Sequence, residues 1–377
     1  MACARKVMIV GGGVGGMTLA IALRRRGIAV QVVEQARRED QLGTGINLQN
    51  NALRALDDVG VLEECVAKGY GWNTVANCDS RGTLLSRITL PWPTAPGRPG
   101  ALGIMRTVFA DILARHAIAA GAELSFQTTI GQLEQRADRV IVTLSDGRTE
   151  EVDVVVAADG VYSKVRRLVF GDAHQPRYAG QGVWRYTVPR PESLDGFTLF
   201  RTSGGDTVGC LPLAADLCYY FYLETSPEKL RFDEDALPDA LAARLAPFEA
   251  PEVREAVAMI HDGRHISFRP FDILLMPPPW HKGRVALLGD AAHSLTPQLT
   301  SGGGMAIEDA VVLAEELERG PDIDAALQAY GRRREGRVGT IYANSLRICE
   351  LEMGKSPDGT EGTGLMVESF KLLATPY

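Results

Sequence analysis

The sequence predicts an α/β protein with three parts: a parallel-sheet domain, a β-sheet-rich domain inserted into it, and a C-terminal helical segment. Three observations lead to this class. An apolar strand at Lys6–Val10 runs into a glycine-rich turn that opens a helix. A strand-rich stretch of aromatic and polar residues fills the middle of the chain, from residue 178 to about 275. A second glycine cluster opens another helix near residue 302.

Length and composition narrow the class of protein. The 377 residues favour two domains, and a net charge of −7 argues against nucleic acid as the main partner. No apolar run reaches the roughly 18 residues of a membrane span, so we expect no membrane association. The six cysteines are scattered without a C-x-x-C pair, which favours reduced thiols in a cytoplasmic protein and predicts no metal site.

The first glycine-rich turn carries the pattern G-x-G-x-x-G at Gly11, Gly13 and Gly16, after a strand and before a helix. The first glycine allows the turn, the second admits a pyrophosphate, and the third lets helix and strand pack closely. Glu34 ends the next strand, where a carboxylate can accept hydrogen bonds from a ribose and disfavours a 2′-phosphate. This predicts a Rossmann-like domain for FAD or NAD; the alternative is a glycine-rich turn with a surface glutamate.

Two further motifs follow buried strands. Asp159-Gly160 leads into "VYSKVR", which in isolation is more typical of a capped strand–helix junction than of a binding site. Gly289-Asp290 ends a second strand, and Gly302–Gly304 open a helix whose N-terminus favours negative charge. A reduced flavin is negatively charged at one edge. We therefore expect the first glycine-rich helix start to hold the pyrophosphate of FAD and the second to hold the redox end of the same molecule.

Together the motifs resemble the single-component FAD-dependent aromatic hydroxylases of the para-hydroxybenzoate hydroxylase type, nearest to the salicylate, 6-hydroxynicotinate and urate hydroxylases. They span most of the chain in the family's order: "GGGVGG…E", "GTGINLQNNALRAL", Arg106 ahead of a helix, "DGVYSKVR", "GDAAH…P…GGG…AIEDA" and "YGRRREGRV". The resemblance implies an FAD-binding domain of the glutathione-reductase type, a substrate-binding sheet domain and a helical segment. Their expected bounds are, respectively, residues 1–72, 101–177 and 280–330; residues 73–100 and 178–279; and residues 331–377.

The resemblance also implies the cofactor-binding residues. They are Gly11, Gly13, Val14, Gly15, Gly16, Glu34, Gln35, Gly45, Ile46, Arg106, Ile130, Asp159, Asp290, Gly302, Gly303 and Gly304. Arg106 would contact the phosphate or ribityl region, Asp159 would also support the nicotinamide, and Gly43–Ile46 would line the flavin's path. NADH or NADPH would visit as a transient co-substrate without a Rossmann domain of its own. One departure stands in the family's P-x-x-G-x-G loop, where Thr300 replaces the first glycine.

On the substrate side, the expected catalytic residues are Tyr219, Arg185, His293 and Pro297. Arg185 could pair with a substrate carboxylate or phenolate, or be structural. His293 could be a catalytic base, but a structural histidine beneath the loop is the favoured interpretation. We expect Trp184 and the tyrosine cluster at 219–222 to line a solvent-poor pocket. Thr207 falls where the urate-hydroxylase pattern has an arginine, so urate is not the expected substrate.

The resemblance implies a monooxygenase that uses FAD, NAD(P)H and O2 to hydroxylate a small phenolic or N-heteroaromatic ring through a flavin C4a-hydroperoxide. Two alternatives remain: an FAD-dependent reductase or dehydrogenase acting on C=C bonds, and a non-catalytic flavin-binding regulator. A flavin halogenase is disfavoured because "WRYTVP" stands in place of W-x-W-x-I-P. We expect a monomer or a homodimer.

Overall fold

A computed structural model describes residues 2–37, 44–90, 97–261, 263–354 and 360–377. Its first layer is a six-stranded sheet in the order β18-β19-β12-β1-β2-β8, parallel except for the β18–β19 pair. In that order the strands are His281–Lys282, Val285–Leu287, Val154–Ala157, Lys6–Val10, Ala29–Glu34 and Glu123–Phe126. Sequence-distant segments thus form one sheet, as expected of a Rossmann-like domain.

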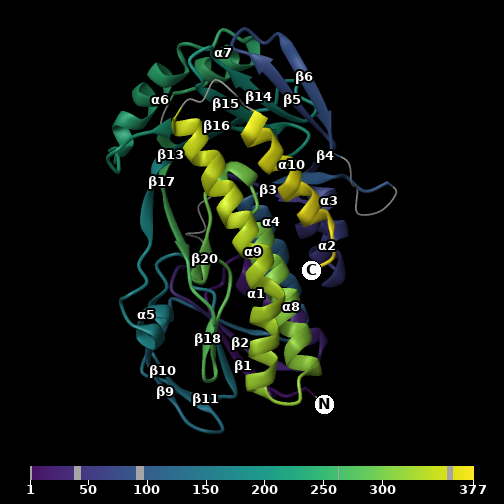
Figure 1. The fold of residues 1–377 in the computed structure, drawn as a ribbon, viewed down its shortest axis with the longest axis vertical. Helices are drawn as coiled ribbons and strands as arrows, with labels where there is room; N and C mark the ends of the chain where they lie inside the picture. Colours follow the sequence, from purple (N-terminus) through teal and green to yellow (C-terminus); the bar gives the residue numbers. More distant parts are fainter. Residues whose placement is uncertain (1, 38–43, 91–96, 262, 355–359) are drawn as a thin grey trace.

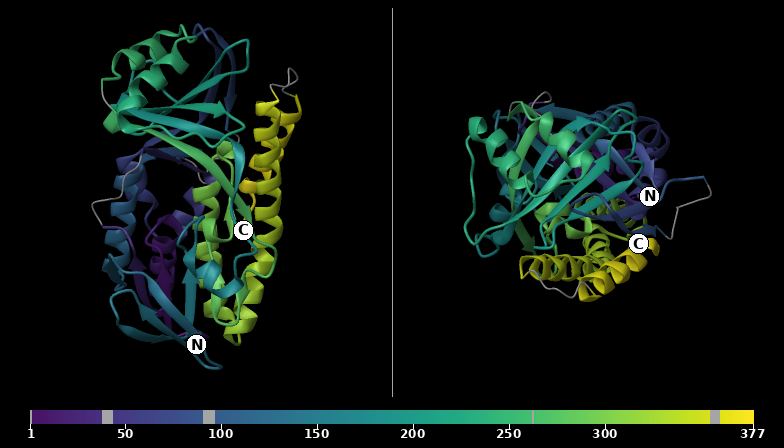
Figure 2. Two further views of the ribbon diagram at one scale, coloured as in Figure 1. Left: turned by 90° about the vertical axis from the view of Figure 1, so that its left-hand side faces the viewer. Right: turned by 90° about the horizontal axis from the view of Figure 1, so that it is seen from above.

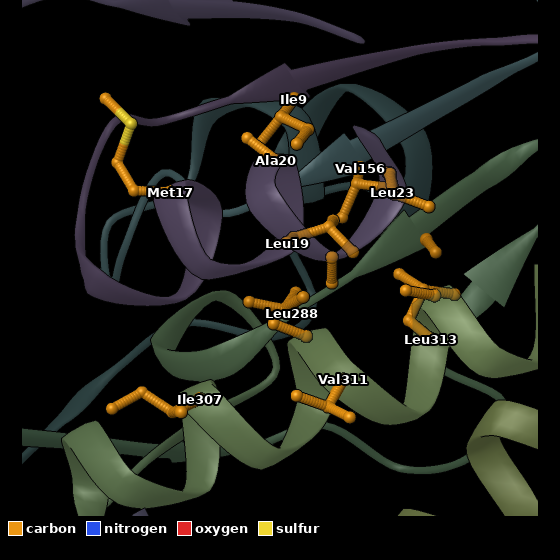
Figure 3. Close-up of a cluster of buried hydrophobic side chains, with 14 of the residues drawn as sticks. Ile9, Met17, Leu19, Ala20, Leu23, Val156, Leu288, Ile307, Val311 and Leu313 are labelled. Atoms are coloured by element: carbon orange, nitrogen blue, oxygen red, sulfur yellow. The ribbon is translucent and has the colours of Figure 1, made fainter. Parts of the chain in front are cut away.

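Helices α1 (Val14–Arg25) and α8 (Gly302–Arg319) pack against each other beside this sheet. Figure 3 shows their contact, in which Leu19 of α1 and Val311 of α8 lie near Leu288. All three side chains are buried, with at most 1% of their surface exposed. Because these two helices carry the glycine-rich starts, one core positions both helix N-termini.

The second layer is an eight-stranded sheet in the order β20-β17-β13-β16-β15-β14-β5-β6, which occupies the upper part of Figure 1. In that order its strands are His293–Ser294, Ile266–Leu275, Arg177–Pro189, Leu217–Thr225, Thr207–Pro212, Phe197–Arg201, Thr74–Asp79 and Leu84–Thr89. On its outer side lie α6 (Leu237–Leu245), extended by the short turn η2 (Glu234–Ala236), and α7 (Pro251–Ala258).

Two three-stranded sheets complete the β-structure. One has the order β3-β7-β4, with strands Gly45–Gln49, Ala101–Met105 and Tyr70–Trp72. The other has the order β11-β10-β9, with strands Thr149–Val152, Val140–Leu144 and Ile130–Gln135. Asp153 separates two strands in different sheets, and its Oδ2 accepts hydrogen bonds from the amides of Arg5 and Lys6.

The remaining helices connect these layers. They are α2 (Asn50–Asp58), α3 (Leu62–Lys68), α4 (Arg106–Ala119), α5 (Lys164–Phe170), α9 (Ile323–Met353) and α10 (Thr360–Ala374). Helix α9 runs from the parallel sheet up to the β-rich part, with α10 beside its upper end (Figures 1 and 2). The predicted class, a nucleotide-binding α/β domain with a β-rich part and C-terminal helices, is confirmed. The predicted domain bounds stay a prediction.

Candidate functional site

Two cavities lie where the parallel sheet meets the β-rich part. The larger, about 390 Å³, is bounded by the first glycine turn, the start of α4 and the start of α8. The smaller, about 130 Å³, lies under the eight-stranded sheet. Five residues line both: Asn47, Arg185, Tyr219, Pro297 and Thr300. The two spaces therefore meet at a common wall.

The three glycines of the G-x-G-x-x-G pattern meet different surroundings. A Cβ on Gly11 (φ +110°) would lie 2.2 Å from the carbonyl oxygen of Ala158, and one on Gly16 would lie 2.1 Å from that of Gly11. A side chain at either position would collide with the backbone, so glycine is needed there for the strand, turn and helix to pack closely. A Cβ on Gly13 would meet no atom of the described residues within 4 Å, and Gly13 lines the larger cavity together with Val14, Gly15 and Gly16. The turn thus offers an open backbone, which a pyrophosphate can approach, at the positive end of α1.

Glu34 lies at the end of β2, beside this turn. Its Oε2 accepts a hydrogen bond from the amide of Gly12 at 2.7 Å, and its Oε1 accepts one from the amide of Ala36 at 2.8 Å. Gln35 is exposed. Ile130 is buried, and its carbonyl accepts a hydrogen bond from Nζ of Lys164. None of these three expected cofactor residues lines the larger cavity, and their cofactor roles stay predictions.

Asp159 caps helix α5. Its oxygens accept hydrogen bonds from the Ser163 hydroxyl and from the amides of Lys164 and Val165. Burial raises the pKa of Asp159, and these hydrogen bonds oppose the rise. The interpretation as a capped strand–helix junction therefore holds. Its neighbour Gly160 lines the larger cavity, which leaves the proposed cofactor role of Asp159 as a prediction.

Arg106 and strand β3 form another wall of the larger cavity. Arg106 is the first residue of α4, and its amide donates to the Thr44 carbonyl at 3.1 Å. Gly45 and Ile46 line the cavity beside it, whereas Gly43 lies outside the described residues. A Cβ on Gly45 would lie 2.5 Å from the Tyr219 ring. A glycine is thus needed for β3 to approach the eight-stranded sheet.

The second glycine cluster faces the same cavity as the first. Gly302 and Gly303 line the cavity at the start of α8. Gly304 does not, and a Cβ on it would point toward the Asn51 side chain. Asp290 also lines the cavity, in the turn η4 (Gly289–Ala291). Its side chain is open to the cavity but surrounded by protein atoms. Burial therefore raises the pKa of Asp290, while the charges of His293 and Arg106 oppose the rise.

Thr300 adopts a left-handed conformation (φ +48°) after the turn η5 (Pro297–Leu299). This conformation is unusual for a β-branched residue, and it explains why the family pattern has glycine there. The Thr300 hydroxyl accepts hydrogen bonds from Nδ2 of Asn47 at 3.0 Å and Nε2 of Gln49 at 2.7 Å. These bonds hold the loop against β3 at the junction of the two cavities.

His293 lines neither cavity and is fully buried. Its Nε2 lies 2.6 Å from Oδ2 of Asp309, which also accepts from the amide of Gly289 at 3.0 Å. Asp309 in turn bonds Nε of Arg334 at 2.7 Å. The ring belongs to a hydrogen-bonded network beneath η4, which favours the structural interpretation; the catalytic role considered for His293 stays a prediction. Asp309 and Arg334 occur in the quoted motifs "AIEDA" and "YGRRREGRV", but their pairing could not be read from sequence.

Arg185 and Tyr219 lie on the wall shared by the two cavities. Burial lowers the pKa of Arg185 to about 10, so its guanidinium stays charged at neutral pH. Burial also raises the pKa of Tyr219, although the charges of Arg185 and Arg106 oppose the rise. The site therefore presents a fixed cation beside a protonated phenol, a pair suited to an anionic or polar ring oxygen.

Trp184 does not line the pocket, contrary to expectation. It is fully buried on the opposite face of β13, where its Nε1 donates to Glu224 and its ring packs against Phe232. Tyr220 and Tyr222 also lie on that face, whereas Tyr219 and Phe221 face the smaller cavity. Other lining residues of the smaller cavity were missed because no motif marks them, among them Arg201, Gln298, Glu352, Met366 and Phe370.

Other site types find no support within the described residues. No group of three or more histidine, cysteine or acidic side chains there is placed to hold a metal ion. All six cysteines are free thiols. Among the helices that the structure describes, none has the length and apolar character needed to cross a membrane.

Comparisons with known proteins match this geometry. Residues 4–345 match the FAD binding domain family. The chain is 32% identical over 375 residues to a putative FAD-dependent monooxygenase, YetM, of Bacillus subtilis, covering 99% of this chain and 100% of that one. It is 31% identical over 374 residues to an FAD-dependent urate hydroxylase of Klebsiella pneumoniae, covering 94% and 92%.

A solved structure has the same fold. The crystal structure of Klebsiella pneumoniae HpxO complexed with FAD and uric acid superposes with a TM-score of 0.81 at 29% identity, covering 98% of this chain and 92% of that one. The fold, the sequence relatives and the glycine-lined cavity all indicate an FAD-binding protein. The chain therefore belongs to the FAD binding domain family and is an FAD-dependent monooxygenase.

Proposed function

We propose that this monooxygenase uses NADH or NADPH and O2 to hydroxylate a small phenolic or N-heteroaromatic ring. The observation that carries the proposal is the common wall of the two cavities. The larger one has the glycine-lined backbone and helix N-termini that suit FAD. The smaller one, about 130 Å³, approaches the size of an engineered apolar cavity that binds benzene. A ring held there lies next to the space for the flavin.

The residues of the larger cavity fit FAD. Gly13 leaves its backbone open to the pyrophosphate, Arg106 supplies a cation, and Asp290 supplies an acceptor for ribityl hydroxyls. The N-terminus of α8, with Gly302 and Gly303, adds a positive dipole end for the redox ring. Bound FAD would supply the electrons that activate O2.

The chain's own residues would orient the substrate and exclude water. Trp72, Phe197 and Phe221 give the smaller cavity apolar walls, and Pro297 and Thr300 separate it from the flavin space. Arg185 would stabilise a phenolate or ring oxygen, which makes the ring electron-rich. Tyr219 beside it would hold a hydrogen bond to the same oxygen.

The relatives act on small rings, as their names state: urate, and 3-hydroxybenzoate in the case of a 6-hydroxylase of Aquipseudomonas alcaligenes. The sequence argued against urate because Thr207 replaces an arginine. That argument is weakened by Arg201, whose Nη1 donates to the Thr207 hydroxyl at 3.2 Å from the neighbouring strand. A guanidinium therefore still reaches this wall, and urate belongs in any substrate panel.

The test is anaerobic flavin reduction by NADH and by NADPH, with and without phenolic acids, hydroxylated N-heteroaromatics and urate. We expect one coenzyme and one ring class to accelerate flavin bleaching together. Equally fast bleaching without any ring compound would contradict the proposal and favour a reductase acting on C=C bonds. Absence of any coenzyme oxidation across the panel would favour a non-catalytic flavin-binding protein.

A further inference from the structure

A charged pair that no motif predicted lies in the wall of the smaller cavity. Arg201 comes from β14, and Glu352 is the penultimate residue of α9. Gln298, which directly follows Pro297, lies between the loop and Glu352, and its Nε2 donates to Oε2 of Glu352 at 3.1 Å and to Oε1 of Gln181 at 2.6 Å. We name Arg201, Gln298 and Glu352 the distal polar group.

The two charges of the distal polar group do not satisfy each other. Although both belong to the described residues, no ion pair joins Arg201 to Glu352 within 4.0 Å. Arg201 donates to the hydroxyl of Thr207, which lies opposite it on the neighbouring strand. Glu352 is enclosed by protein. Burial raises its pKa, whereas the hydrogen bond from Gln298 and the charge of Arg201 oppose the rise. A guanidinium donor and a carboxylate acceptor thus line one cavity without contact.

Apolar side chains also surround this group in the cavity wall, alongside the polar residues already described. Val183 and Leu223 face each other across β13 and β16 on the same wall, and Met366 and Phe370 of α10 line the cavity as well. In such surroundings an unmatched charge on a ligand is costly, whereas a matched hydrogen bond is worth more than in water. The opposite charges of Arg201 and Glu352 offset each other, so neither a ligand anion nor a ligand cation is favoured by both.

We propose that the distal polar group binds an uncharged amide-type substituent of the substrate, such as a carboxamide or a ring lactam. Its carbonyl oxygen accepts from Arg201 and its N–H donates to Glu352, while Arg185 and Tyr219 hold the ring oxygen at the flavin side. This inference deepens the proposed function and rests on its assignment of the smaller cavity to the substrate. It distinguishes this chain's substrate from a simple hydroxybenzoate, whose second group is an anion.

The test measures equilibrium binding of small probes to the FAD-loaded protein in the absence of coenzyme. The change in flavin absorbance reports the binding. Three probes share one ring: 4-hydroxybenzamide, 4-hydroxybenzoate and 4-hydroxybenzylamine. We expect the amide to bind about tenfold or more tightly than either charged probe, since each charged probe meets one like charge. Binding of none of the three, or tighter binding of the benzoate, would overturn the inference.

Two variants sharpen the test. Glu352→Gln leaves the charge of Arg201 uncompensated, so the preference should move to 4-hydroxybenzoate. Arg201→Met leaves the carboxylate, so the preference should move to 4-hydroxybenzylamine. The matched controls are Glu350→Gln, exposed on α9, and Arg87→Met, exposed on β6, which should retain the wild-type order. FAD content and melting temperature show that each variant is folded. An unchanged order in both cavity variants would contradict the proposed contacts.

The outcomes separate this inference from the proposed function. If the amide is preferred but coenzyme is consumed without incorporation of oxygen from O2, the contacts stand and the hydroxylase proposal fails. If the benzoate is preferred and hydroxylated, the hydroxylase proposal stands, but the distal polar group does not bind an amide substituent of the substrate.

Discussion

At the scale of single residues, alternation along β13 and β16 decides which side chains reach the cavities. Arg185 and Tyr219 face the site, whereas Trp184 and Tyr220 face the core under α6 and α7. Alternation along a strand predicts that Tyr219 shares a face with Phe221, and Tyr220 with Tyr222, as the structure shows. It could not tell which face was the site, since both faces are apolar and covered, and α7 was not predicted.

Arg185 should lower the pKa of a bound phenol, because its charge stabilises the phenolate. We expect 4-nitrophenol bound to the wild-type protein, and to Arg185→Lys, to ionise at lower pH than the free compound. In Arg185→Met the bound phenol should ionise at higher pH than in the wild type. The measurement is the visible absorbance of the phenolate, corrected for the flavin, across a pH series. Equal ionisation in the wild type and the Met variant would remove Arg185 from the substrate contacts.

Asp290 should contribute to FAD affinity, because its carboxylate is open to the larger cavity and has room to accept from the ribityl chain. Loss of a charge-assisted hydrogen bond in Asp290→Ala should weaken FAD binding about tenfold or more. Fluorescence titration of the apoprotein with FAD measures this. Asp235→Ala, at an exposed position, is the control. Full flavin occupancy of Asp290→Ala after dialysis would show that the assignment is wrong.

At the scale of elements, two helix N-termini face one cavity. The strand, turn and helix signals around Gly11–Gly16 and Gly302–Gly304 were read correctly from sequence, because each depends only on local spacing. The network beneath η4 was not, since Asp309 and Arg334 lie on different helices and meet only in the folded chain. The conformation of Thr300 could not be predicted from sequence either, because β-branched residues rarely adopt the left-handed region in which it lies.

Two glycines of the first turn should respond differently to alanine. Gly13→Ala adds a methyl group in open space and should change the stability of the apoprotein by less than about 0.5 kcal/mol, yet weaken FAD binding. Gly16→Ala forces a methyl group against the Gly11 carbonyl and should destabilise the apoprotein by about 1–3 kcal/mol. Urea unfolding with and without FAD separates the two effects. Equal losses of apoprotein stability would contradict these roles.

The ionic network beneath η4 should be important for stability. Burial raises the pKa of Asp309, but His293 and Arg334 overcome this and lower it from 3.8 to about 2. Removing this partner of the buried Arg334 guanidinium in Asp309→Asn should cost about 3–5 kcal/mol at pH 7. Because the folded pKa lies below the unfolded one, the stabilisation is present above about pH 4 and lost as pH falls toward 2.

The measurement for this network is urea unfolding of the wild type and Asp309→Asn at several pH values. The difference between the two proteins should narrow as the pH is lowered from 4. Asp324→Asn, at a side chain that is 69% exposed, should differ from the wild type by less than about 0.5 kcal/mol. A difference between wild type and Asp309→Asn that grows on acidification would contradict the assigned pKa.

At the scale of the whole molecule, α9 joins the parallel sheet to the β-rich part, and its C-terminal end contributes Glu352 to the smaller cavity (Figure 2). That cavity draws its walls from residues as distant in sequence as Asn47 and Phe370. The fold class followed from local patterns and their order. The composition of the substrate cavity did not, because it depends on how helices without motifs dock onto the sheet.

The central claim is that a ring in the smaller cavity receives oxygen at the common wall of the two cavities. The most direct test is turnover of the FAD-loaded protein under ¹⁸O₂, with the coenzyme and ring compound that together accelerate flavin reduction. Mass spectrometry of the product should show one ¹⁸O atom for each molecule of coenzyme oxidised in coupled turnover. A modified product that carries no label, formed with coenzyme consumption, would contradict the claim.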